Sequence, residues 1–232
     1  MTLFRQTKLS KLLLISSLKL HSFSYKLSSY FAIKYFGAHP KHRIINYFKW
    51  FNDLIGENDV VIDIGSNTGA MVFELAKKPR RTIYGIEIDK KYSDIAVANN
   101  TCANVQFFCA DATTFDYQHT PEIDVITMSN VLEHISDGKN FLKKIVTAVS
   151  WSVSGAKILI RVPALDREWP VLMKKELGIE YRLDRTHYTE YTNKEIYSVL
   201  AYAGLEISTI ERSFGEIYIV CVKNGGATAC VS

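Results

Sequence analysis

Residues 60–69 read Val60-Val61-Ile62-Asp63-Ile64-Gly65-Ser66-Asn67-Thr68-Gly69. The first five are apolar apart from one aspartate, which is typical of a strand buried on both faces of a sheet. A glycine directly after the strand allows a sharp turn and brings backbone N–H groups close to a ligand. A helical pattern follows from Thr68 to Lys77 and is closed by Pro79. A strand, a glycine turn and a helix in this order predict the opening unit of a parallel α/β sheet.

The same alternation continues along the chain. We predict further strands at 82–86, 105–109, 123–127 and 157–162, and helices at 90–99 and 139–150. Thr192-Asn193-Lys194-Glu195 has the form of a capping box, which opens a helix to about Tyr202. The strands expected at 205–211 and 217–222 are too close together for a crossover helix, so they form a hairpin. The prediction is a doubly wound α/β fold: a mostly parallel seven-stranded sheet with a C-terminal antiparallel hairpin and an N-terminal helical segment.

Acidic residues follow the second and third predicted strands. Glu87 ends the second strand and is about 20 residues beyond the glycine loop, and Asp111 follows the third. In open α/β sheets the carboxyl ends of neighbouring strands form the ligand edge. A carboxylate at the position of Glu87 can accept both hydroxyls of a ribose. Asp111 can take an adenine amino group, or it can simply cap a helix.

In this order the motifs resemble those of class I S-adenosylmethionine-dependent methyltransferases of the small-molecule type, over about residues 44–222. The loop Asp63–Gly69 matches the first motif of that family, with Asn67 in place of a glycine, and Asn130-Val131-Leu132-Glu133-His134 is similar to its fourth-strand motif. Pro163 and Ala203-Gly204-Leu205 also match. The resemblance implies S-adenosyl-L-methionine as the cofactor. It implies that the cofactor is bound by Asp63, Gly65, Ser66, Asn67, Gly69, Glu87, Ile88, Asp111, Ala112 and Asn130.

A nicotinamide enzyme is the competing interpretation. The dinucleotide fingerprint places its third glycine three residues after the second, whereas Gly65 and Gly69 are four apart. Asp63 directly before the loop suits the cationic amino-acid part of a methyl donor better than it suits a pyrophosphate.

On the acceptor side, His134 and His187 are the predicted catalytic residues. His134 lies just beyond the fourth strand and can act as a general base, or it can shape the loop. His187 can line the acceptor pocket, together with Trp169, Tyr181, Arg182 and Arg185, or cap the inserted segment. Some relatives bind a metal through a Glu-x-x-Glu-His set, and Glu133, His134 and His187 resemble it. Because Asn130 replaces the first of those glutamates, we expect no metal.

The N-terminal segment differs in composition from the rest. Residues 1–58 carry nine Lys and Arg against Asp53 and Glu57, in a chain of net charge +4. We expect residues 1–55 to be a basic, aromatic-rich helical segment, and 56–232 to be a methyltransferase domain with an acceptor-side insert at 164–190. For residues 1–35 we expect either a basic amphipathic helix that contacts a membrane surface peripherally, with Leu9, Leu12, Leu13 and Leu20 on one side, or a helix packed on the domain.

Two bulk features bear on the compartment. No stretch approaches the ~20 apolar residues that span a bilayer. The four cysteines show no C-x-x-C spacing and are expected to be free thiols in a reducing compartment. We expect a cytoplasmic protein, with membrane association as the alternative.

The sequence therefore predicts a methyltransferase that acts on an oxygen of a small-molecule, saccharide or lipid-linked acceptor. Two alternatives remain open. One is an RNA or protein methyltransferase that uses the basic segment, although nucleic acid is the less favoured partner. The other is a non-catalytic cofactor-binding scaffold.

Overall fold

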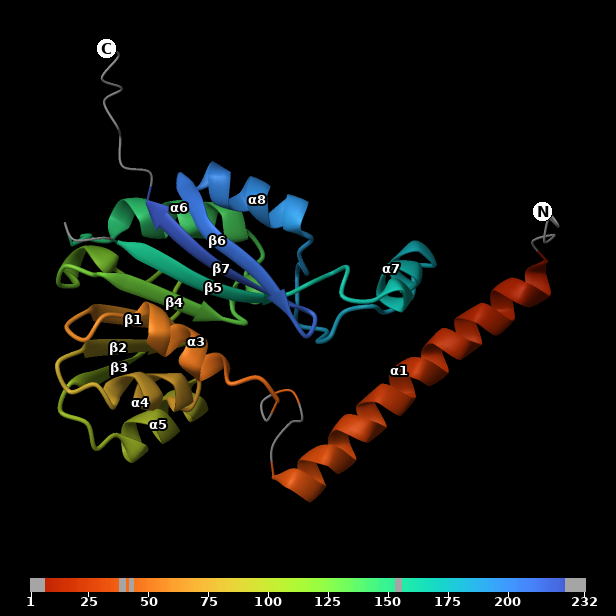
Figure 1. Cartoon of the computed structure of the whole chain (residues 1–232), viewed down its shortest axis with the longest axis horizontal. Coiled ribbons are helices and arrows are strands. Elements are labelled where there is room, and N and C mark those ends of the chain that lie inside the picture. The colour runs from red at the N-terminus through yellow and green to blue at the C-terminus, as the bar shows by residue number, and fades with distance from the viewer. Residues whose placement is uncertain (1–6, 38–40, 42–43, 153–155, 224–232) are drawn as a thin grey trace, which may run out of the picture. The chain divides into compact units, whose positions relative to one another are not determined.

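The structure, a computed structural model, describes residues 7–37, 41, 44–152 and 156–223. The chain divides into two compact units (Figure 1). One combines residues 1–47 with 165–182, and the other combines 48–164 with 183–232.

The second unit contains a seven-stranded sheet in the order β3-β2-β1-β4-β5-β7-β6. The parallel strands are β1 (Val60–Ile64), β2 (Thr82–Glu87), β3 (Val105–Cys109), β4 (Val125–Ser129) and β5 (Lys157–Pro163). β7 (Glu216–Lys223) is antiparallel to both β5 and β6 (Leu205–Ser213). The predicted doubly wound fold and its closing hairpin are therefore confirmed.

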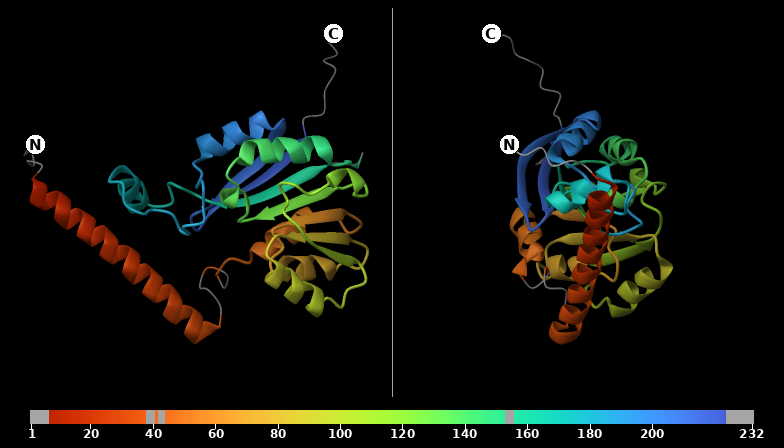
Figure 2. Two further views of the ribbon diagram at one scale, coloured as in Figure 1. Left: turned by 180° about the vertical axis from the view of Figure 1, so that it is seen from behind. Right: turned by 90° about the vertical axis from the view of Figure 1, so that its right-hand side faces the viewer.

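Helices cover both faces of this sheet (Figure 2). On one face lie α6 (Gly138–Ala148) and α8 (Asn193–Tyr202), whose apolar side chains share a core cluster with Ile62, Ile64 and Ile126 of the central strands. On the other lie α4 (Ala70–Ala76) and α5 (Lys90–Asn99), which contact β2 and β3. The order of β1 and β4 at the centre, with β2 and β5 outside them, places the loops after β1 and β4 side by side.

The helix α3 (Tyr47–Leu54) leads into the sheet unit, and Arg81 holds its end. The Arg81 side chain is only 1% exposed and donates hydrogen bonds to the carbonyl oxygens of Asn52, Ile55 and Gly56. Burial lowers the pKa of this guanidinium. These bonds satisfy the backbone acceptors at the end of α3, which would otherwise be buried without partners.

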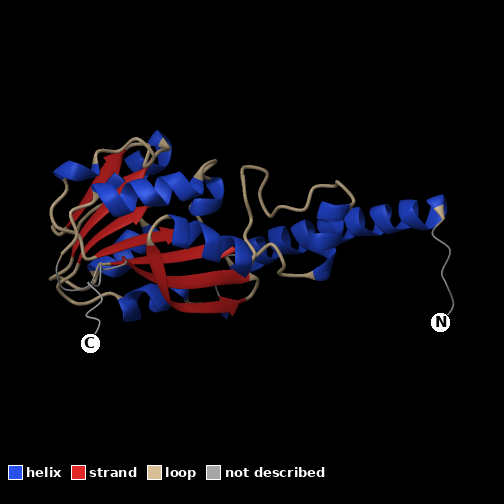
Figure 3. Ribbon diagram, turned by 90° about the horizontal axis from the view of Figure 1, so that it is seen from above, coloured by secondary structure: helices blue, strands red, loops and turns tan. Residues whose placement is uncertain are grey.

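The remaining helices are α1 (Lys8–Phe36) and α7 (Trp169–Glu176), which belong to the first unit and contact each other. Figure 3 shows helices in blue and strands in red. The helix α1 begins with a capping box between Thr7 and Ser10 and ends at Gly37, whose φ is 73°. Residues 38–40, which follow it in the sequence, lie outside the described residues. The helix α7 falls in the stretch 164–190, for which we predicted an insert and no helix.

Several predicted bounds shift by a few residues. The helix after the glycine loop begins at Ala70 rather than Thr68, because the loop continues to Gly69. The fourth strand runs from Val125 to Ser129 rather than 123–127. Ile123 forms only a single bridge to Trp151, so the continuous ladder starts two residues later.

Candidate functional site

The loop after β1 is fastened to both neighbouring strands. The N–H groups of Gly65 and Ser66 both donate to the carbonyl oxygen of Ile86 on β2, at 2.8 and 3.1 Å. Gly65 has a φ of 72°, and a Cβ added to it would lie 2.5 Å from Cγ2 of Val131, in the loop after β4. Glycine is therefore required at this position for its backbone conformation and for lack of space.

Asn67 stands where the motif that the loop resembles has a glycine, and it takes a glycine-like conformation. Its φ is 49°, in the left-handed region that asparagine tolerates better than most residues. Its N–H donates a hydrogen bond of 2.8 Å to Oε2 of Glu87, and its side-chain oxygen accepts from the N–H of Thr68. The departure from the motif thus preserves the course of the loop.

The loop does not present a row of free N–H groups, however. The N–H of Gly69 donates to the carbonyl oxygen of Ser66, so every N–H from Gly65 to Gly69 has an acceptor within the chain. The expectation that loop N–H groups face a ligand is wrong for these five residues, because the loop uses them to hold its own turn.

Glu87 is fixed at the end of β2. Its side chain is 8% exposed, and its second oxygen accepts from the N–H of Asp89 at 2.8 Å. The next residue, Ile88, is 66% exposed and leaves an apolar side chain beside this carboxylate. Beyond β3, Oδ1 of Asp111 accepts from the N–H and the hydroxyl of Thr113, so Asp111 stabilises a local turn and has a second oxygen left. Ala112 beside it is half-buried.

Asp63 lies beneath the loop. Its carboxylate is 2% exposed and accepts a hydrogen bond of 2.6 Å from the hydroxyl of Thr127, its register partner on β4. Burial raises the pKa of Asp63 to about 7. The hydrogen bond from Thr127 lowers this pKa in part, and the nearby negative charge of Glu87 raises it further. A cation placed next to this carboxyl would favour its ionised form.

Around the glycine loop, two buried polar atoms have no hydrogen-bond partner within the described part of the chain. They are the hydroxyl of Ser66 and Oδ1 of Asn130. Asn130 directly follows β4 and has a φ of 57°. Unsatisfied oxygens together with Asp63, Glu87 and Asp111 suit a ligand that offers a cation, hydroxyls and N–H groups, and they do not suit a phosphate.

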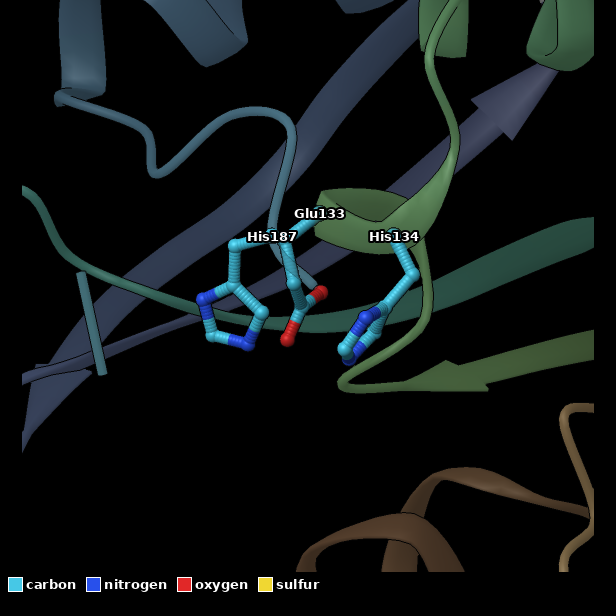
Figure 4. Close-up of side chains that lie close together, drawn as sticks. All are labelled: Glu133, His134 and His187. Carbon is cyan, nitrogen blue, oxygen red and sulfur yellow. The ribbon is translucent and has the colours of Figure 1, made fainter. Parts of the chain in front are cut away.

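The residues that the sequence predicted for the acceptor side come from distant parts of the chain. Glu133 and His134 lie in the short helix η2 (Leu132–His134) after β4, and His187 comes from the segment before α8. The rings of His134 and His187 meet edge to face, with centroids 4.7 Å apart. One ligand atom from each of Glu133, His134 and His187 lies within 4.8 Å of the other two, and Figure 4 shows the carboxyl group between the two rings.

Each histidine is oriented through its Nδ1. Nδ1 of His187 is 3.0 Å from Oε1 of Glu190, and both side chains are buried. Nδ1 of His134 is 3.1 Å from the hydroxyl of Thr186. Burial and the neighbouring His187 lower the pKa of His134, whereas Asp184 raises it. The pKa of Glu133 is raised to about 8 by burial.

The structure therefore brings together Asp63, Glu87 and the glycine loop at one end, and Glu133, His134 and His187 at the other. Val131, packed on Gly65, joins the two. Sequence reasoning missed Thr127, Thr186 and Glu190, whose roles depend on pairing across strands and on the path of the segment before α8. Of the other predicted acceptor residues, Arg185 is exposed. Arg182 is already ion-paired with Glu180, at 2.9 Å.

Comparison with known proteins identifies the family. A model of a methyltransferase domain matches residues 36–210. A SAM-dependent methyltransferase from Aquifex aeolicus has a similar structure, with a TM-score of 0.61 and 16% identity over 82% of this chain and 96% of that one. A SAM-dependent methyltransferase from Methanosarcina mazei has a TM-score of 0.60 and 18% identity, over 75% of this chain and 96% of that one. Magnesium protoporphyrin IX methyltransferase from Synechocystis, with bound SAH, has a TM-score of 0.60 and 13% identity, over 79% of this chain and 83% of that one.

Proposed function

Because this chain belongs to the methyltransferase-domain family and is an S-adenosylmethionine-dependent methyltransferase, we propose that it methylates an oxygen atom of a small-molecule, saccharide or lipid-linked acceptor. The observation that carries the proposal is the pair of neighbouring rings of His134 and His187. Val131, in the same loop as His134, packs on Gly65 of the glycine loop and so links the pair to the predicted cofactor site. Hydroxyl groups are poor nucleophiles until they lose a proton, and imidazole is the side chain best suited to remove one near neutral pH.

The cofactor would be held by the residues at the carboxyl edge of the sheet. Asp63 and Oδ1 of Asn130 offer oxygens to its cationic amino group, and Ser66 lies next to them. Glu87, whose two oxygens are each held by one backbone N–H, keeps acceptor capacity for two ribose hydroxyls. Asp111 and Ala112 would bind the adenine edge, and the exposed Ile88 would cover its face. Gly65 and Gly69 keep the loop free of side chains.

When bound, the cofactor supplies a methyl group on a positively charged sulfur. The protein must orient the acceptor oxygen in line with that methyl group and take up its proton. The His134 side chain is exposed and is held at Nδ1 by Thr186, so its Nε2 can receive the proton. His187 is buried beside it and bound to Glu190, which suits an orienting role. The name of the Synechocystis neighbour, a porphyrin methyltransferase, is consistent with a small-molecule acceptor.

A labelling experiment tests the acceptor class. Full-length protein would be incubated with a 13C-methyl donor and with separated small-molecule, lipid, RNA and protein fractions of a cell extract. We expect the label in the small-molecule or lipid fraction, with a methyl carbon shift typical of attachment to oxygen. Label in RNA or protein, or on nitrogen or carbon, would refute the proposal. Tight cofactor binding without label in any fraction would favour a scaffold.

The helix α1 gives the protein a second proposed contact, with an anionic membrane surface. Only Leu18 of its 29 residues is buried, and Leu14 and Ile15 beside it are half-buried. At about 3.6 residues per turn, the opposite side carries a continuous stripe of exposed large apolar residues. This apolar stripe consists of Leu9, Leu12, Leu13, Leu20, Phe23, Leu27, Tyr30 and Phe31.

Charge indicates what covers the apolar stripe. The sequence of α1 contains five lysines and no acidic residue, and Lys8, Lys19 and Lys26 follow one edge of the stripe. A second copy of the helix would add like charges without an acidic partner, whereas an anionic lipid surface would attract them. No helix in the described ranges has the length and apolarity needed to cross a membrane, so the proposed contact is peripheral.

Vesicle sedimentation of the full chain tests this contact. We expect binding to phosphatidylcholine vesicles that contain phosphatidylglycerol and little binding to phosphatidylcholine alone. Lys19→Gln with Lys26→Gln should weaken binding roughly 10–30-fold, at about 1 kcal/mol per lysine. Leu20→Ser with Phe23→Ser should weaken it at least as much, whereas Tyr25→Ser, at an exposed position two turns from Leu18 on the side of the helix opposite the apolar stripe, should not. Equal effects of all three changes, or concentration-dependent dimers without vesicle binding, would contradict the proposal.

A further inference from the structure

Glu133 is a buried carboxyl group that lies near the charge of Arg161. Its side chain is 1% exposed, and neither carboxyl oxygen has a hydrogen-bond partner in any other described residue. Leaving such a group unsatisfied is costly, so the groups that the Glu133 carboxyl faces indicate what it binds. Figure 4 shows that it faces the rings of His134 and His187.

The hydrogen bonds around the two histidines determine which ring nitrogen carries a lone pair. The hydroxyl of Thr186 donates its only proton to Oδ1 of Asp184, at 2.8 Å, and so can only accept from His134. Nδ1 of His134 is then the protonated nitrogen. Nδ1 of His187 likewise faces a carboxylate oxygen of Glu190, which can only accept. Both imidazoles in their neutral form therefore keep a lone pair on Nε2.

Together these groups make a set of metal ligands. We propose that Glu133, Nε2 of His134 and Nε2 of His187 bind one divalent transition-metal cation. Two imidazoles and one carboxylate suit Zn²⁺, Fe²⁺ or Co²⁺. Each histidine has the outer hydrogen bond that usually orients a metal-bound imidazole, from Glu190 and from the Thr186–Asp184 pair.

The geometry requires only a small contraction. One ligand atom from each of the three residues lies within 4.8 Å of the other two, and metal bonds of about 2.0–2.2 Å bring such atoms to roughly 3 Å. His134 is exposed and lies on a single short turn, so it can make this movement. The replacement of a glutamate by Asn130 led us to expect no metal. The structure supplies three ligands without that position, which is enough for a site with open coordination positions.

The proposed metal rests on the proposed function for its role. An acceptor oxygen on an open position of the cation would lose its proton more readily. With the cation bound, His134 and His187 would act on the acceptor oxygen through the metal, since a metal-bound Nε2 has no lone pair left to take a proton. In the metal-free protein Nε2 of His134 keeps the base role described under the proposed function.

The experiment measures metal binding apart from activity. Full-length protein stripped with a chelator would be titrated with Co²⁺, following its visible absorption, and with Zn²⁺ in competition. We expect one Co²⁺ per chain, displaced by Zn²⁺. Glu133→Gln and His187→Gln should each weaken binding by at least about tenfold, the usual scale for loss of metal-site groups. His119→Gln, a histidine paired with Asp116 outside the site, serves as the control.

Cofactor affinity measured by calorimetry separates the possible failures. Variants that lose Co²⁺ but bind S-adenosylmethionine as the wild type does support the metal site in a folded protein. Wild-type protein that binds the cofactor but takes up no Co²⁺, or takes it up equally in Glu133→Gln, would overturn the metal site and leave the methyltransferase function standing. Wild-type protein that takes up Co²⁺ at this site but labels only RNA or protein would refute the proposed acceptor and leave the metal site standing.

Discussion

The N–H of Asn67 donates a 2.8 Å hydrogen bond to Oε2 of Glu87, which ties the glycine loop to the end of the neighbouring strand. One carboxylate therefore has two tasks. It holds the left-handed turn at Asn67, and it remains available at the ligand edge of the sheet.

Glu87→Gln should separate these tasks. The amide keeps one oxygen acceptor but turns an NH₂ group toward the N–H of Asn67 or of Asp89, so one of the two bonds is lost. We expect cofactor affinity to fall roughly 10–100-fold, the effect of about 1–3 kcal/mol for a lost hydrogen bond to a charged group. Calorimetry with Glu74→Gln, a surface glutamate paired with Lys77, is the control. Equal affinity in both variants would contradict the role of Glu87.

Gly65→Ala should damage the loop more than the strain of a positive φ alone explains. The new Cβ would lie 2.5 Å from Val131, whereas one at Gly204, with a similar φ of 76°, would meet no atom within 4 Å. Gly204→Ala should cost about 1–2 kcal/mol of unfolding free energy. Gly65→Ala should cost more and should also abolish cofactor binding. Urea denaturation and calorimetry measure both, and intact binding in Gly65→Ala would refute the placement of the cofactor.

Cofactor affinity should depend on pH through Asp63. Its pKa of about 7 in the free protein means that it takes up a proton as the pH falls below that value and then no longer attracts a cation. We expect affinity to rise by up to about tenfold per pH unit below pH 7 and to level off above it. Calorimetry between pH 5.5 and 7.5 should show this rise in the wild type and a flat profile in Asp63→Asn. Glu87 is the other carboxylate that acts on Asp63, so Glu87→Gln should lower the midpoint.

The same carboxyl group affects stability in the opposite direction. Since its pKa is raised above that of the unfolded chain, folding favours the protonated form, and this contribution is lost as the pH rises toward 7. Thr127→Val removes a hydrogen bond that lowers the pKa and should therefore shift the affinity midpoint upward. A midpoint that stays in place in Thr127→Val would show that another group titrates.

Arg81 should be essential to the junction between α3 and the sheet. Arg81→Lys keeps the charge but cannot reach the carbonyl oxygens of Asn52, Ile55 and Gly56 at once. We expect a loss of about 2–4 kcal/mol of unfolding free energy in urea denaturation, because buried acceptors lose their donors. Arg80→Lys, at the exposed neighbouring position, should change stability by less than about 0.5 kcal/mol. Similar stability of the two variants would be evidence against this role.

Local sequence patterns determined the order and type of the sheet elements. Five apolar runs, the helices between them and the capping box at Thr192 were predicted within a few residues of their observed bounds. Such patterns are sufficient because a strand buried on both faces, a helix cap and a tight turn each depend on a few neighbouring residues. The ligand edge followed from the same patterns, since parallel strands must end together.

Only the tertiary structure decided how the polar groups of the site are paired. Asp63 meets Thr127 across two strands, the segment before α8 brings His187 to Glu133, and Arg81 reaches back to the end of α3. These contacts join residues that are 26–64 positions apart, so no helix or strand periodicity in the sequence can predict them. The sequence shows which residues are present. The pKa of a carboxyl group, and the histidine nitrogen that is available to a ligand, depend on burial and on neighbouring groups. Burial and neighbours are defined only after the chain has folded.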